Sequence, residues 1–317
     1  MVITGFITLL LLMFGSHSEA NVQSYPRIAP PSSRDRILII APHIDDESIG
    51  AAGYAADAIA NGADVYVAFL TAGDCNRFSA RLINKTLGPT SANYLTVGRT
   101  RIAEARSAMK LLGVPTDHYF ILGYPDRGLR AILDNRHDVI RSRGTAQRAV
   151  PYDEAMSPGS PYRFNSMMSD IERVAEVAKP TTVIAPVLFD LHPDHAAAAE
   201  ITDLVLEDLD LHPHRLGYLV HSSRIPTALL HTPARALKPP ARMRSLTWAT
   251  YPLTSGVQKQ KDTILQTYKS QRPYTSILRN AFVRTNELFF VYKETAMPDL
   301  VVPPNAVTTR MRIPVAR

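Results

Sequence analysis

Two short segments concentrate side chains that bind metals and transfer protons. They are Pro42-His43-Ile44-Asp45-Asp46-Glu47 and Asp190-Leu191-His192-Pro193-Asp194-His195. Imidazole nitrogen and carboxylate oxygen form a standard zinc ligand set, in which three protein ligands leave a fourth position for water. Zinc lowers the pKa of that water to about 7, and a neighbouring carboxylate that is not a ligand can take its proton. Asp45 and Asp46 permit this division of labour, with one on the metal and the other facing the water.

Each segment alone also has an ordinary explanation. The acidic residues of the first segment could be N-terminal helix charges, and His192 and His195 could be surface histidines. Both segments follow apolar runs that are typical of buried strands, however, so a parallel sheet would bring them to one edge. We therefore predict a metal site that is built from both segments.

The apolar pattern of the chain predicts the elements that position these segments. Strands are predicted over residues 36–41, 64–71, 118–122, 182–186 and 215–220, and helices over residues 47–61, 100–112, 165–178, 194–209 and 258–269. This alternation predicts an α/β fold with a doubly wound, mainly parallel, Rossmann-like sheet and helices on both faces. Residues 129–162 show little periodicity, and we interpret them as a long loop over the site.

The motifs resemble those of a known family. The segment at residues 43–47 (HIDDE) resembles the H-P-D-D-E signature of the PIG-L/LmbE-like N-acetylglucosaminyl deacetylases, and residues 192–195 match their H-P-D-H signature. Residues 71–74 (TAGD), 101–105 (RIAEA), 122–128 (LGYPDRG) and 261–271 (KDTILQTYKSQ) resemble further family segments in the same order. The resemblance extends from about residue 36 to residue 292. Ile44 departs from the usual proline, a change expected to alter loop stiffness more than chemistry.

The resemblance implies roles for five residues of the two segments. Carried over by position, the metal ligands are His43, Asp46 and His195. The general base is Asp45, and His192 steadies the oxyanion or protonates the leaving amine.

The resemblance also implies two substrate contacts. Arg101 and Asp126 match positions that the family uses to hold the sugar. Arg101 could instead form an ion pair with Glu104 on its own helix, and Asp126 could be a turn-forming aspartate. The substrate contacts therefore depend on the resemblance more heavily than the metal ligands do.

The activity that the resemblance implies is zinc-dependent hydrolysis of the N-acetyl group of an N-acetylglucosamine-type sugar or glycoconjugate. Fe²⁺ is a second candidate metal, because nitrogen and oxygen ligand sets accept several divalent ions. The alternatives are an amidase for another N-acylated small molecule and a catalytically silent glycan-binding protein. Pure binding has no need of a base at Asp45. A dinucleotide-binding oxidoreductase is excluded, because the first strand is not followed by a G-x-G-x-x-G loop.

The N-terminus predicts export. Residues 2–14 are almost wholly apolar, and Ser18 and Ala20 occupy the −3 and −1 positions of a cleavage site. We interpret residues 1–20 as a signal peptide, although no Lys or Arg precedes the apolar run, and an uncleaved membrane anchor is the alternative. Residues 21–35 are then a linker, residues 36–295 a deacetylase-like domain and residues 296–317 a C-terminal extension.

Composition limits the remaining classes. The chain of 317 residues has a formal net charge of +6 and a sequence pI near 9.4. Its basic residues form no dense run, which argues against nucleic acid as a partner and leaves a weak attraction to anionic surfaces. Cys75 is the single cysteine, so no intrachain disulfide is possible. Oligomeric state is left open by the sequence.

Overall fold

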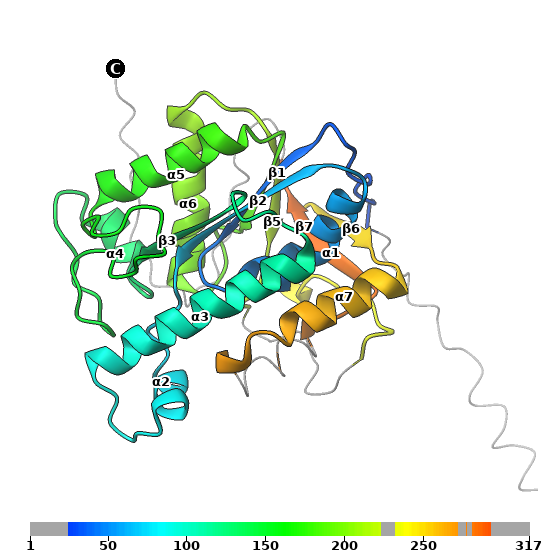
Figure 1. Cartoon of the computed structure of the whole chain (residues 1–317). Coiled ribbons are helices and arrows are strands. Elements are labelled where there is room, and N and C mark those ends of the chain that lie inside the picture. Colours follow the sequence, from blue (N-terminus) through cyan, green and yellow to red (C-terminus); the bar gives the residue numbers. More distant parts are fainter. Residues whose placement is uncertain (1–24, 223–231, 272–276, 278–280, 293–317) are drawn as a thin grey trace, which may run out of the picture.

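The computed structural model describes residues 25–222, 232–271, 277 and 281–292. The elements in chain order are β1 (Arg36–Ala41), α1 (Asp46–Ala60), β2 (Asp64–Thr71), α2 (Arg77–Asn84), α3 (Ser91–Leu112), β3 (Tyr119–Tyr124), α4 (Leu129–Asp134), α5 (Phe164–Ala178), β4 (Thr182–Pro186), α6 (Pro193–Asp208), β5 (His214–Tyr218), η1 (Ala241–Met243), β6 (Trp248–Pro252), α7 (Ser255–Leu265), η2 (Lys269–Gln271) and β7 (Asn286–Val291). Figure 1 shows α5 and α6 on one face of the sheet and α1, α3 and α7 on the other.

The strands form one sheet in the order β3-β2-β1-β4-β5-β7-β6. Strands β1 to β5 pair in parallel, and β7 is antiparallel to both β5 and β6. The chain builds outward from β1 through β2 to β3, and then returns to β4 on the other side of β1. The predicted doubly wound, mainly parallel fold is confirmed. The border between β1 and β4 is the switch point, where open α/β sheets bind ligands.

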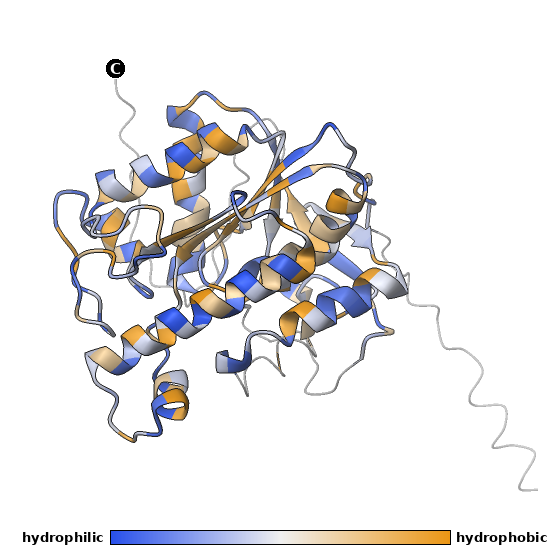
Figure 2. Ribbon diagram, in the orientation of Figure 1, coloured by the Kyte–Doolittle hydropathy of each residue, from blue (hydrophilic) through white to orange (hydrophobic). Residues whose placement is uncertain are grey.

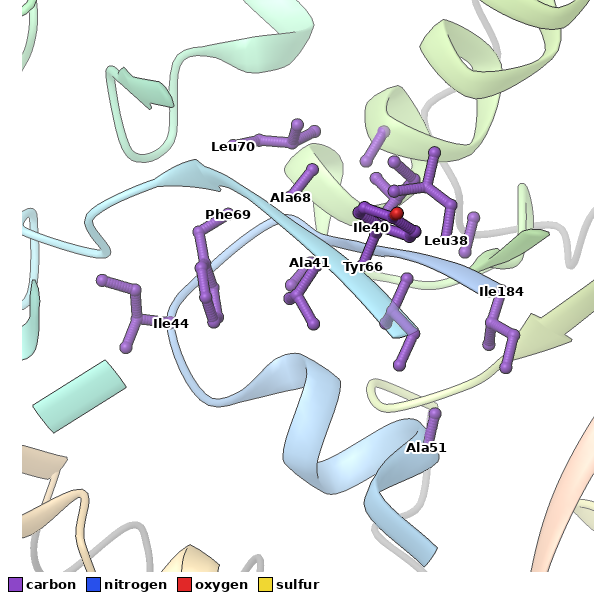
Figure 3. Packing of buried hydrophobic residues seen from close by; sticks show 14 of the residues in the cluster. Leu38, Ile40, Ala41, Ile44, Ala51, Tyr66, Ala68, Phe69, Leu70 and Ile184 are labelled. Atoms are coloured by element: carbon purple, nitrogen blue, oxygen red, sulfur yellow. The ribbon is translucent and has the colours of Figure 1, made fainter. Parts of the chain in front are cut away.

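The parallel strands are apolar on both faces, because helices cover both. Side chains alternate between faces along a strand, and Figure 3 shows Leu38, Ile40 and Ala68 on the face of β1 and β2 away from α1. Ala41 and Phe69 lie on the α1 face, and all five side chains are buried. In Figure 2 the central strands are mostly orange, whereas α3 and α7 carry both orange and blue residues. Burial on both faces holds β1 and β4 in place, and with them the loops that follow their carboxyl ends.

Helix α1 packs closely against the sheet because it is rich in alanine and glycine. A Cβ atom at Gly50 would lie 2.6 Å from the Tyr218 ring, and one at Gly53 would lie 2.5 Å from Leu253. Glu287 of β7 accepts hydrogen bonds from the backbone N–H groups of Gly53 and Tyr54, both at 2.8 Å. Lys261 of α7 forms a buried ion pair with Glu287 at 2.5 Å. These contacts hold α1, whose first turn belongs to the site, against α7 and β7.

Several predicted bounds are confirmed and others are wrong. Strands β1, β2 and β4 match the prediction, while β3 and β5 differ from it by one or two residues at each end. Helix α3 begins at Ser91, nine residues before the predicted start, and α4 lies inside the stretch interpreted as a loop. Helix α2 and the antiparallel strands β6 and β7 were not predicted.

The terminal predictions have little structural evidence. The predicted signal peptide at residues 1–20 and the extension at residues 296–317 lie outside the described residues. Within the predicted linker, the backbone of Ile28 donates to Thr250 of β6 at 3.0 Å, and Thr250 donates to Pro26 at 2.8 Å. Within the described ranges, none of the helices combines the length and the apolar character that a membrane crossing requires.

Candidate metal centre

The two predicted segments meet at the switch point. Oδ2 of Asp46 lies 3.1 Å from Nδ1 of His43 and 3.0 Å from Nε2 of His195. The ring centroids of His43 and His195 are 5.3 Å apart. Strand order explains the meeting, since β1 delivers His43 and Asp46 and the adjacent β4 leads to His195. The structure therefore brings together the three predicted ligands, which are 152 positions apart at their extremes (195 − 43).

The histidine and aspartate side chains gathered at this point are of the types that bind a divalent metal ion. Ligand atoms of His43, His192 and His195 lie within 4.8 Å of one another, and so do those of two overlapping groups: Asp190, His195 and His221, and His43, Asp126 and Asp194. Nε2 of His195 is buried and lies 3.0 Å from Asp46, yet among the described residues neither it nor Nδ1 of the same ring has a partner in hydrogen-bonding geometry. Two ligands bonded at about 2.1 Å in a tetrahedral arrangement lie about 3.4 Å apart, near the separations around Asp46. A divalent ion would satisfy that nitrogen.

Carboxylates face the other nitrogen of each imidazole. Nε2 of His43 lies 3.3 Å from Asp194 and 3.4 Å from Asp126, and Nδ1 of His195 lies 3.3 Å from Asp190. Such carboxylates fix the orientation and tautomer of metal-binding histidines and raise their basicity. Burial opposes ionisation of Asp46, but His195 and His43 outweigh it and hold the pKa of Asp46 well below its usual value. The cluster thus keeps Asp46 charged without a metal.

Asp190 connects the loop after β4 to the end of β5. Its Oδ1 accepts the backbone N–H of His192 at 2.9 Å, and its Oδ2 accepts those of Val220 and His221, both at 3.0 Å. Nδ1 of His221 lies 3.2 Å from Asp190, and the His221 ring is 4.5 Å from that of His195. Sequence reasoning included Asp190 in the second segment but gave it no role. The signal was an aspartate directly upstream of a histidine-rich helix start.

Asp45 sits in an unusual backbone conformation. Its φ is 116° and its ψ is −21°, in a region that side-chain-bearing residues rarely adopt and that clusters at functional sites. Burial raises the pKa of Asp45 to about 7, with Asp46 and Glu47 adding to the effect and Arg101 opposing it. A carboxyl with that pKa can accept a proton near neutral pH.

Arg101 pairs with Asp45, the predicted base, and not with Glu104 of its own helix. Its guanidinium lies 3.2 Å from Asp45 and donates to the carbonyl oxygens of Gly73, at 2.8 Å, and Ile44. The alternative pairing with Glu104 is wrong, because Glu104 accepts from the backbone and hydroxyl of Ser270 at 2.8 and 2.6 Å. Arg101 is only 4% exposed. Its contacts hold the loop that carries Asp45, and the predicted sugar contact stays a prediction.

Asp126 also lies inside the cluster. It is 6% exposed, approaches His43, and accepts the backbone N–H of Cys75 at 2.7 Å. It is therefore more than a turn-forming residue. The predicted contact of Asp126 with a sugar stays a prediction.

His192 is held as a neutral hydrogen-bond donor. It caps α6, and its Nδ1 accepts the backbone N–H of Asp194 at 3.2 Å. Its ring centroid lies 4.7 Å from that of His43. Burial, followed by the neighbouring His43, lowers the pKa of His192 to about 3. With Nδ1 as acceptor, the neutral ring carries its proton on Nε2.

Two buried carboxyls support the site from behind. Glu47 accepts from the hydroxyls of Ser48 and Tyr268, and burial raises its pKa. Asp74, in the loop after β2, accepts from the Tyr152 hydroxyl, and burial raises its pKa to about 7. Tyr152 belongs to the stretch predicted as a loop over the site, so this contact ties that stretch to the sheet edge.

The sheet and the cluster at its switch point define a Rossmann-like α/β protein with a candidate metal centre of histidine and aspartate. The chain belongs to the PIG-L family, described as GlcNAc-PI de-N-acetylase, whose model matches residues 38–206. A 1D-myo-inositol 2-acetamido-2-deoxy-alpha-D-glucopyranoside deacetylase of Actinosynnema mirum is 31% identical over 179 residues. That match covers 55% of this chain and 54% of the relative, so the chain matches about half the length of the curated relative.

Solved structures share the fold at lower identity. The N,N'-diacetylchitobiose deacetylase of Pyrococcus horikoshii has a TM-score of 0.51 at 16% identity, with 92% of this chain and 94% of that chain covered. A 4-carboxy-2-hydroxymuconate hydratase of Pseudomonas putida also has a TM-score of 0.51, at 15% identity, covering 83% of this chain and 98% of that chain. The same scaffold thus occurs in proteins named for different reactions, and function has to be argued from the site.

Proposed function

We propose that this protein is a zinc-dependent hydrolase that removes the N-acetyl group from an N-acetylglucosamine-type sugar or glycoconjugate. The observation that carries the proposal is the convergence of His43, Asp46 and His195, with Asp45 next to them in sequence and a pKa near 7. Family membership and the deacetylase name of the curated relative support the reaction class.

His43, Asp46 and His195 would hold the zinc. When bound, zinc supplies a Lewis acid and a water that loses its proton near neutral pH. Asp45 accepts that proton as the water oxygen attacks the amide carbonyl, and the Arg101 guanidinium at 3.2 Å holds the Asp45 carboxylate in place. Removing such a base typically costs a factor of about 10² to 10⁴ in rate.

His192 stabilises the charge that develops on the carbonyl oxygen. A neutral imidazole with its proton on Nε2 donates a hydrogen bond to an oxyanion. A pKa of about 3 makes the imidazolium scarce at neutral pH, so this role is favoured over proton donation. The proton that Asp45 has accepted then passes to the leaving nitrogen. The amide C–N bond breaks, and acetate and a free amino sugar are released.

Acetate release is the direct test of this function. Purified protein is incubated with N-acetylglucosamine, N-acetylated oligosaccharides and glycolipids, with and without a chelator, and the chelated protein is then given Zn²⁺ or Fe²⁺. We expect chelator-sensitive release of acetate that the correct metal restores. Release of a different acyl group would favour the amidase alternative, and glycan binding without release would favour the silent binding protein.

Asp45→Asn tests the base within the same assay. Asparagine tolerates the positive φ but cannot take a proton, so metal content should be retained while turnover falls by about 10² to 10⁴. Asp57→Asn is the matched control, because Asp57 lies on the same helix and accepts a hydrogen bond from Tyr251 at 2.7 Å. Wild-type turnover by Asp45→Asn would remove Asp45 as the base.

We further propose that the mature protein is exported. The apolar run of residues 2–14 and the small residues Ser18 and Ala20 support cleavage after Ala20. N-terminal sequencing of exported material should then begin at Asn21, and a sequence beginning at Met1 would favour an uncleaved anchor.

A further inference from the structure

Helix α2 and the turn after it expose an unusual number of apolar side chains. Phe78 is 41% exposed, Leu82 53% and Leu87 86%. These are three of the six exposed large hydrophobic residues in the described part of the chain, gathered within ten positions. Phe78 and Leu82 are four residues apart and share a helix face, whereas Ser79 and Ala80 are buried against the protein. The helix is therefore anchored by one face and apolar on another.

The same segment is basic and has no acidic residue. Arg77, Arg81 and Lys85 are exposed and alternate with the three apolar residues. Between Cys75 and Glu104 the sequence contains five basic residues and not one Asp or Glu. Figure 2 shows orange and blue residues together on α2. Interleaved Arg, Lys, Phe and Leu on a surface helix are typical of segments that lie on anionic membranes.

The exposed segment is held in place. Asn76 caps α2 by accepting from the backbone N–H groups of Phe78 and Ser79, at 3.0 and 3.1 Å. Nε of Arg81 donates to the carbonyl oxygen of Leu87 at 2.9 Å, which keeps the turn beside the helix. The exposed apolar residues thus lie on a helix and turn that are held by hydrogen bonds.

This segment lies at the same edge of the sheet as the candidate metal centre. It is the next element after β2, with five residues between them, and the N–H of Cys75, two residues before Arg77, donates to Asp126 at 2.7 Å. Asp126 in turn lies 3.4 Å from Nε2 of His43. Figure 1 shows α2 at the periphery of the molecule, beyond the layer of α3 and α7. A surface that receives α2 would therefore face the edge of the sheet that holds the site.

We propose that residues 77–87, which form the α2 surface, dock on an anionic lipid bilayer. Arg77, Arg81 and Lys85 pair with lipid phosphates, and Leu82 and Leu87 enter the boundary between headgroups and acyl chains. Each basic residue near such a surface contributes about fivefold to the affinity. The docking is separate from the predicted N-terminal segment, and it does not depend on the proposed reaction. If the reaction holds, its site is turned towards substrates on the bilayer.

A fluorophore on the α2 surface tests docking without interference from the N-terminus. Gly88→Cys places a thiol beside Leu87, where a Cβ would meet no atom within 4 Å. Burial raises the pKa of the native Cys75 thiol to about 12, so a maleimide probe at neutral pH favours the introduced thiol. We expect a blue shift with vesicles of phosphatidylcholine and phosphatidylglycerol, and none with phosphatidylcholine alone. A probe on Val177→Cys of α5, a position that is 51% exposed, should not shift.

Variants of the full chain separate the two parts of the surface. Arg77→Gln with Arg81→Gln should weaken vesicle affinity by about 25-fold, from about fivefold for each charge. Leu82→Ser with Leu87→Ser should also abolish most binding. Leu111→Ser should not, although Leu111 is 46% exposed and thus close to Leu82 in exposure. Circular dichroism and thermal unfolding establish that each variant is folded.

The result that overturns the proposal is an unshifted probe with anionic vesicles. A shift of equal size at Val177 would do the same, because it would show non-specific adsorption. Sedimentation velocity tests the alternative that the α2 surface binds a second copy of the chain. A wild-type dimer that Leu82→Ser with Leu87→Ser converts to monomer, with no vesicle binding by either protein, would assign the α2 surface to self-association instead.

Discussion

Replacing Asp190 with asparagine removes one negative charge from the point where the loop after β4 meets the end of β5. The carboxylate accepts three backbone N–H groups with two oxygens, and it faces Nδ1 of His195 at 3.3 Å. Asparagine offers a single acceptor oxygen, so at least one of the three N–H groups loses its partner. The neutral amide also withdraws the charge that supports the basicity of His195.

Both effects have a calculable size. A hydrogen bond to a charged group contributes about 1.5–3 kcal/mol, so the free energy of unfolding of the metal-free variant should fall by about that amount. Loss of a carboxylate behind a metal-binding histidine costs about 10- to 100-fold in metal affinity. That range corresponds to about 1.4–2.7 kcal/mol of binding free energy.

The assay is competition for Zn²⁺ against a chromophoric chelator, combined with urea denaturation of the metal-free protein. Asp170→Asn is the matched control: Asp170 is equally buried and accepts hydrogen bonds from Tyr124 at 2.8 Å and Ser157 at 2.6 Å, but it faces no histidine of the cluster. It should lose stability and keep its zinc affinity. An Asp190→Asn variant that binds zinc as tightly as wild type would refute the reasoning.

Two further predictions concern buried charges. Lys261→Met leaves Glu287 as a buried carboxylate without its cation, so the free energy of unfolding measured in urea should fall by about 3–5 kcal/mol. Arg130→Met breaks a partly exposed ion pair with Glu200 and should lower it by only about 0–1 kcal/mol. Equal losses in the two variants would contradict this difference between buried and partly exposed pairs. Because burial raises the pKa of Asp74 from 3.8 to about 7, its contribution to stability falls as pH rises through that window. Asp74→Asn should therefore gain on the order of 4 kcal/mol over wild type between about pH 4 and pH 8. A pH-independent difference between the two proteins would exclude this titration.

The buried parallel strands could be predicted closely from the sequence because their environment leaves a strong pattern. Strands β1, β2 and β4 are continuous apolar runs buried on both faces, and they have the predicted bounds. Strand β7 (NELFFV) was missed because its pairing is antiparallel and depends on contacts with β5 and β6 that are distant in sequence. Helix α2 was missed because six of its eight residues are exposed or polar and the helix is too short to show a clear helical period.

The residues of the site could be predicted more fully than the contacts between them. Histidine and aspartate after two strands predicted a metal site, and the family resemblance assigned its ligands to His43, Asp46 and His195. The strand order then brings these three residues together. The links between Asp190 and Val220, and between Arg101 and Asp45, join loops whose approach depends on the whole fold. No local pattern encodes such links. The positive φ of Asp45 was likewise hidden, because aspartate at a helix start normally adopts an extended conformation.

The left-handed backbone at Asp45 has a consequence for mutagenesis of this protein. Alanine, the usual choice for deleting a side chain, would keep the torsional cost of φ 116° without the polar side chain that tolerates it. The loop could then relax, and the neighbouring Asp46 would move with it. An inactive alanine variant would therefore confuse a missing proton acceptor with a displaced ligand, whereas asparagine for chemistry and glycine for torsion would separate the two causes.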